Sequence, residues 1–130
     1  MGGNPNGAYG NAGMAGVEMA VINAIIQSMA GSVLNGQIGA QLAPVDQSFR
    51  LKQLGSLMQA GAINQAQQWV NPQTGSTFML NPVGAQSVNP QTQQNCQKME
   101  EVSISKAGQR VAEERLACQN AQTGKWNFVQ

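Results

Sequence analysis

Histidine is absent from this 130-residue sequence, and charged and aromatic side chains are scarce. Without histidine, the chain lacks the commonest general base and the commonest protein ligand for metals. Charged residues make up 10% of the chain, against about 25% in an ordinary globular domain, and the net charge is only +1. Such a balance provides no basic surface for nucleic acid. The aromatic content of 5% argues against a large conventional core.

Cysteine is also rare, with one residue at Cys96 and one at Cys118. Two cysteines are too few for a zinc site without other donors, and these two are too far apart for a redox motif of the CxxC type. We therefore expect no metal and no other cofactor. The remaining alternatives are two free thiols or one structural disulfide, which would indicate an oxidising compartment.

The first half of the chain has the composition of helices. Residues 1–13 are rich in Gly and Asn and predict a flexible leader. From residue 14 the apolar side chains recur at helical spacing, and Ile22, Ile25 and Ile26 belong to this face. Residues 14–61 are therefore expected to form a Gly/Ala-rich helical segment that contacts other helices or a membrane.

Small residues follow, notably Gly31, Gly36 and Gly39. They permit helix backbones to approach closely, in an oligomer or in lipid. A Gly-rich loop between two helices is the alternative, because each Gly costs an isolated helix up to about 1 kcal/mol relative to Ala.

A further helix is predicted for residues 47–60, with Asp46 as its N-cap or first-turn acid. Arg50 and Lys52 are expected to lie away from its apolar face. That face carries four side chains, namely Leu51, Leu54, Leu57 and Met58.

Residues 62–130 change to the short alternating pattern of β-strands and predict a β module. Strands are expected at residues 65–70, 76–80, 95–104, 109–118 and 126–129. The fold class is therefore α+β, with N-terminal helices followed by a small antiparallel sheet of about five strands.

A hairpin loop at residues 106–108, with Gly108 in the left-handed conformation, sets the register of the two long strands. Counting outward from this loop places Cys96 opposite Cys118, close enough for a disulfide bond. Closing that loop is worth roughly 3 kcal/mol on the chain-entropy estimate. We therefore favour the disulfide over two free thiols.

The same register places like charges across from each other, Glu100 opposite Glu114 and Glu101 opposite Glu113, which is unfavourable. A β-bulge or two nearby cations can relieve the repulsion, namely Lys98 and Arg115. Facing carboxylates are also found in acid/base catalysis, but a solvated face is the favoured interpretation here because no nucleophile accompanies them. We predict that the chain is not an enzyme.

The second half resembles a known family in an ordered series of residues. The series is Trp69-Val70-Asn71-Pro72-Gln73-Thr74-Gly75-Ser76, Pro82, Cys96, Val102-Ser103-Ile104, Ala117-Cys118 and Gly124-Lys125-Trp126. It is similar to the C-terminal module of the 17-kilodalton surface antigen family of glycine-zipper outer-membrane lipoproteins, and Gly36-Gln37-Ile38-Gly39 resembles the end of that family's zipper. The resemblance implies a lipoprotein of the outer membrane and no enzymatic activity that can be transferred.

Two tryptophans, Trp69 and Trp126, have two interpretations. They can form an aromatic face that binds a ligand, or they can pack in the core of the sheet, which is the favoured interpretation.

The leading functional hypothesis is a structural or assembly protein of the Gram-negative cell envelope, in the outer membrane or periplasm. Its helices would contact other envelope proteins, copies of itself or lipid, and no small-molecule substrate is indicated. If the protein is exported, its leader is absent from this chain, and Met1 can stand where a lipidated Cys belongs. The alternative is a periplasmic binding or inhibitor module that uses the sheet face near the two tryptophans.

Overall fold

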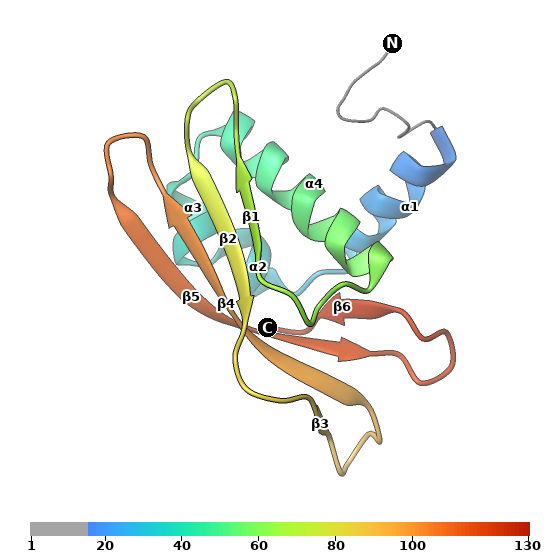
Figure 1. Cartoon of the computed structure of the whole chain (residues 1–130). Helices are drawn as coiled ribbons and strands as arrows, with labels where there is room; N and C mark the ends of the chain where they lie inside the picture. Colours follow the sequence, from blue (N-terminus) through green and yellow to red (C-terminus); the bar gives the residue numbers. More distant parts are fainter. Residues whose placement is uncertain (1–15) are drawn as a thin grey trace.

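The computed structural model describes residues 16–130, so the predicted leader at 1–13 lies outside the described residues. Helices come first and strands follow (Figure 1). The helices are α1 (Gly16–Gln27), α2 (Gly31–Asn35), α3 (Gln37–Gln41) and α4 (Pro44–Ala60). The strands are β1 (Gln67–Val70), β2 (Thr77–Pro82), β3 (Ser87–Val88), β4 (Asn95–Ile104), β5 (Arg110–Gln119) and β6 (Trp126–Phe128).

The strands form one antiparallel sheet in the order β1-β2-β4-β5-β6, with β3 paired to the outer end of β4. The sheet is strongly curled, and α2, α3 and α4 lie against one of its faces, while α1 packs on α4 (Figure 1). The α+β prediction is therefore confirmed. The short β3 was not predicted, because two residues leave no periodicity in the sequence.

The register of β4 and β5 agrees with the prediction residue by residue. Cys96 lies opposite Cys118, and the two are joined in a disulfide. In the loop, the Ser105 N–H donates to the Gln109 carbonyl at 2.9 Å, and Gly108 has a φ of 91°. A turn that only glycine adopts easily therefore fixes the alignment of the whole hairpin.

Helix α4 begins three residues earlier than predicted, at Pro44. Proline fits the first turn of a helix because the N–H that it lacks has no partner there, and its φ is already helical. The helix ends at Gly61, whose φ is 70° and whose N–H donates to the Leu57 carbonyl at 2.9 Å.

The small-residue stretch after α1 is helical but broken. Gly36 is extended, with φ −73° and ψ −166°, and separates α2 from α3. No single helix within residues 16–130 is long and apolar enough to cross a membrane, and the pair Met19–Gln27 and Gly31–Gln41 meets the same criteria only with a bend of 92°.

The core lies between the helices and the inner face of the sheet. Its buried members come from both halves of the chain and are Met29, Val33, Leu54, Leu57, Met58, Ile63, Leu80, Met99, Ala117, Trp126 and Phe128. The helical segment and the β module therefore share one core within the described residues.

Candidate functional site

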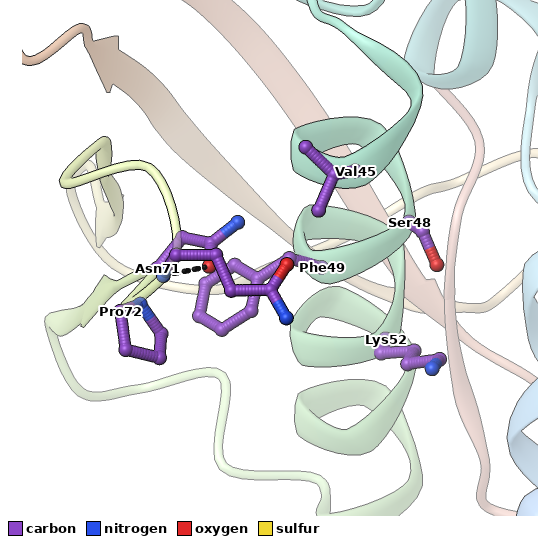
Figure 2. Close-up of a pocket in the computed structure, with 7 residues that line it drawn as sticks. Val45, Ser48, Phe49, Lys52, Asn71 and Pro72 are labelled. Atoms are coloured by element: carbon purple, nitrogen blue, oxygen red, sulfur yellow. Dashed lines mark hydrogen bonds between the residues drawn. The ribbon is translucent and has the colours of Figure 1, made fainter.

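A surface groove lies between the first turns of α4 and the turn that joins β1 to β2 (Figure 2). Its volume is about 350 Å³. Figure 2 shows Phe49 projecting from α4 toward Asn71 and Pro72, and the Phe49 ring also packs against Phe78, with 5.9 Å between the ring centres. The lining residues are Val45, Ser48, Phe49, Lys52, Asn71, Pro72 and Gln73. The groove therefore offers an apolar floor with one ammonium group and one hydroxyl at its rim.

Asp46 holds this turn against α4. Its carboxylate accepts hydrogen bonds from Asn71 Nδ2 at 2.9 Å, Thr74 Oγ1 at 2.7 Å and Ser76 Oγ at 3.1 Å. Ala43 is the N-cap residue of α4, so Asp46 is a first-turn acid and not the cap. One buried carboxylate thus joins the helical segment to the turn at residues 71–76.

A buried ion cluster provides the second junction between the helices and the sheet. Arg50, predicted to lie away from the apolar face, is 1% exposed, and Glu101, predicted to lie on a solvated face, is also 1% exposed. Both predictions were wrong. Arg50 Nε and Nη2 contact the two Glu101 carboxylate oxygens at 2.5 and 3.0 Å. A charge can be buried in this way because its partner and its other hydrogen bonds replace water.

Arg115 resolves the clash of like charges across β4 and β5. Its Nε donates to Glu101 at 2.9 Å and its Nη2 donates to Glu113 at 3.0 Å, so one guanidinium lies between the two opposed carboxylates. The strand pairing continues unbroken through these positions, so no bulge is needed. The Glu100–Glu114 pair lies on the other face of the sheet, where Arg110 Nη2 is 4.0 Å from Glu100.

Glu113 also anchors α3 to the sheet. Its Oε1 accepts the Ile38 N–H at 2.8 Å. Burial by itself raises the pKa of the Glu113 carboxyl, but the hydrogen bond from Ile38, the charge of Arg115 and the hydrogen bond from the Gln37 N–H together hold that pKa below its ordinary value of 4.5.

The glycines predicted for helix packing divide into two kinds. A Cβ at Gly36 would clash with the Ser32 carbonyl oxygen and lie 2.6 Å from Glu113 Oε2, and a Cβ at Gly39 would clash with the Leu34 carbonyl oxygen and lie 3.4 Å from Arg50 Nη1. A Cβ at Gly31 would meet nothing within 4 Å. Gly36 and Gly39 therefore let α3 lie close to the backbone of α2 and beside the buried ion cluster, and Gly31 makes no close contact in the described structure.

The isoleucines of α1 pack on α4 at a glycine that the prediction missed. Ile22 is buried, and Ile25 and Ile26 pack against the core. A Cβ at Gly55 would lie 3.0 Å from Ile22 and 3.2 Å from Ile26, so Gly55 sets the close approach of the two helices. The sequence signal was a lone Gly inside a helical pattern, which usually has a packing reason.

Trp69 and Trp126 belong to the two strands at opposite ends of the strand order, β1 and β6. Trp126 is 8% exposed and belongs to the core, and Trp69 packs against that core. Trp126 also lines a second groove of about 410 Å³ between α1 and the β5–β6 hairpin, to which Trp69 does not contribute. Among residues 19–130, whose side chains the structure describes, no three His, Cys, Asp or Glu side chains are grouped to hold a metal ion.

Comparison with family models, with curated proteins and with solved structures found no match to this chain.

Proposed function

We propose that this chain is a non-catalytic protein of the Gram-negative cell envelope with a structural or assembly role, as a lipoprotein subunit of a larger complex. The observation that carries the proposal is the Cys96–Cys118 disulfide, which joins the ends of the two longest strands. Disulfides of this structural kind persist in the periplasm and on cell surfaces and are rare in the cytosol.

The way in which the two halves are joined supports an assembly role. Asp46 and Arg50 of α4 reach the sheet through buried hydrogen bonds and an ion pair, so the helices and the sheet form one rigid unit. This unit exposes isolated valines, among them Val70 at 53% and Val88 at 55%, and it carries two surface grooves. A rigid body with preformed grooves suits binding to neighbouring proteins, because little conformational entropy is lost when it associates.

A second candidate role, a periplasmic binding module, is favoured by the groove that Trp126 lines. The two roles are compatible, since a subunit of a complex must bind its neighbours.

The test is the intact mass of the protein isolated from fractionated native cells, with and without reductant. We expect it in the membrane or periplasmic fraction, with a lipid adduct at its N-terminus and a bond between Cys96 and Cys118 that only reductant opens to alkylation. A Cys96→Ser/Cys118→Ser variant is the matched control for alkylation. An unlipidated protein with free thiols in the cytosolic fraction would contradict the proposal.

A further inference from the structure

Three connections of the sheet repeat one sequence pattern, Asn-x-Gln-Thr followed by Gly or Gln. They occupy residues 71–75 between β1 and β2, residues 89–93 between β3 and β4, and residues 120–124 between β5 and β6. The sequence signal for these turns is the repeat itself.

The three turns also share one conformation. In each, the N–H of the first Asn donates to the carbonyl five residues later, at 2.9, 2.7 and 2.8 Å. The carbonyl of that Asn accepts the N–H four residues later, at 2.8, 2.7 and 2.8 Å, from a residue with φ of 76°, 62° and 73°. The Asn Oδ1 accepts the N–H two residues later, at 3.0, 2.9 and 2.8 Å. The pattern therefore fixes both the backbone and the orientation of the Asn side chain.

The first of these turns binds a carboxylate. Asn71 Oδ1 and Thr74 Oγ1 accept backbone N–H groups of the turn, which leaves Asn71 Nδ2 and the Thr74 hydroxyl proton to donate. Both donate to Asp46 Oδ1, and Ser76, the residue after the turn, donates to the other oxygen. Hydrogen bonds to an ionised acceptor are stronger than neutral ones, so the turn is a preorganised carboxylate receptor.

The third turn presents the same donors without a carboxylate. Asn120 Oδ1 accepts the Gln122 N–H at 2.8 Å, and Thr123 Oγ1 accepts the Lys125 N–H at 3.3 Å. Asn120 Nδ2 and the Thr123 hydroxyl proton are then available, and no carboxylate of residues 19–130, the part of the chain whose side chains the structure describes, takes them. Lys125 stands where the first turn has Ser76 and adds a positive charge.

These three residues open onto the groove of about 410 Å³ between α1 and the β5–β6 hairpin. The wall of the groove that α1 forms is largely apolar and includes Val21, Ala24 and Ile25, and Trp126 of β6 adds a further apolar side chain. The second turn lacks this setting, because the Thr92 hydroxyl donates to Gln94 within its own exposed loop at 3.3 Å. Only the third turn combines free donors, a cation and an apolar wall among the described residues.

We infer that Asn120, Thr123 and Lys125 bind an aspartate side chain in the first turn of an amphipathic helix of a partner protein. The chain itself contains a contact of this kind. Asp46, near the N-terminus of α4, binds the turn at residues 71–75, and the apolar side chains of α4 pack alongside. The partner's apolar side chains would lie against Ile25 and Trp126. The inference names the partner chemistry of the proposed assembly role and rests on that role.

The test is an NMR titration of the full-length ¹⁵N-labelled protein with an acetylated peptide of the sequence 43–60, which carries the required Asp. We expect saturable shifts of the Asn120, Thr123, Lys125 and Trp126 signals. Replacing the peptide's Asp by Asn should weaken binding about tenfold or more, because hydrogen bonds to a charged group would be lost. Raising the salt concentration should weaken the Asp peptide more than the Asn peptide.

Variants of the protein separate this site from nonspecific attraction. Lys125→Met keeps every hydrogen bond of the turn, since Lys125 takes part through its backbone, and should weaken the Asp peptide about fivefold. Thr123→Val should also weaken binding and Thr123→Ser should restore it. Lys98→Met, an exposed lysine on the other face of the sheet, is the control and should leave binding unchanged.

Equal binding of the Asp and Asn peptides, shifts confined to the groove of Figure 2, or no saturation at millimolar peptide would each overturn the inference. The titration uses purified protein, so its failure would leave the envelope location standing. A cytosolic protein with free thiols, in contrast, would remove the proposed function whatever the titration gave.

Discussion

Glu101 is the residue on which the junction between helices and sheet depends most. It lies between Arg50 and Arg115, and all three side chains are 1% exposed. Glu101→Gln would leave two buried guanidinium groups without their shared counter-ion, and breaking a buried ion pair in this way costs about 3–5 kcal/mol. We expect urea denaturation to show that the free energy of unfolding falls by that amount.

Glu100→Gln is the matched control on the adjacent residue. Glu100 is half-exposed, and its contact with Arg110 is 4.0 Å long. Exposed ion pairs contribute only about 0–1 kcal/mol, so this change should have little effect on the urea concentration at the unfolding midpoint. Equal losses for the two variants would show that the buried cluster does not stabilise the fold.

Gln93 is strained by its backbone. It is the one non-glycine residue within 16–130 with a positive φ, 62°, at the position where the two related turns have glycine. This conformation costs a non-glycine residue roughly 1–2 kcal/mol. Glycine avoids that cost but loses more backbone entropy on folding, so only part of the difference would appear as stability. Gln93→Gly should therefore stabilise the protein by about 0.5–1 kcal/mol. Gln91→Gly, in the same turn without positive φ, should not raise the denaturation midpoint.

At the scale of elements, Gly55 controls how closely α1 and α4 cross. Gly55→Val would push side-chain atoms into Ile22 and Ile26, and overpacking of this kind costs about 1–3 kcal/mol. We expect faster amide hydrogen exchange throughout α1, with protection of β4 and β5 retained. Gly31→Ala, where the new Cβ meets nothing within 4 Å, should leave α1 protected.

The attachment of α3 to β5 should depend on pH. Because the folded-state pKa of Glu113 is below its ordinary value of 4.5, its contribution is present above that value and is lost as the pH falls through the folded-state pKa. The unfolding free energy should therefore decrease below about pH 4.5. Glu113→Gln should flatten that part of the profile, and an unchanged profile would rule out this role of Glu113.

The elements show what the sequence could and could not predict. Strands β4 and β5 and their register followed from local turn chemistry, because one glycine turn fixes every pair beyond it. Arg50 and Glu101 were misplaced because a charged residue is taken as exposed until its partner is known, and this partner is 51 positions away. The Asn and Thr groups of the turns that donate hydrogen bonds to a carboxylate were missed, because their role depends on side-chain orientation, which periodicity does not report.

For the whole molecule, the disulfide is the one covalent link between distant positions in the described chain. Cys96 and Cys118 are separated by 22 residues, and a closed loop of that length is worth about 3 kcal/mol on the chain-entropy estimate. Thermal unfolding should show that the free energy of unfolding is lower by about this amount when reductant is present. The Cys96→Ala/Cys118→Ala variant should melt at the lower temperature in both conditions, and a melting temperature unaffected by reductant would contradict the estimate.

The ion cluster also has a consequence for the order in which the chain can fold during synthesis. Arg50 emerges long before Glu101, and Arg115 comes later still, 14 positions beyond Glu101. Until β4 has appeared, Arg50 of α4 lacks its counter-ion, and until β5 has appeared Glu101 lacks its second partner, Arg115. Contacts so distant along the chain form slowly. The helices should therefore dock late and in a single step, so the nascent protein remains open until its final strands are made.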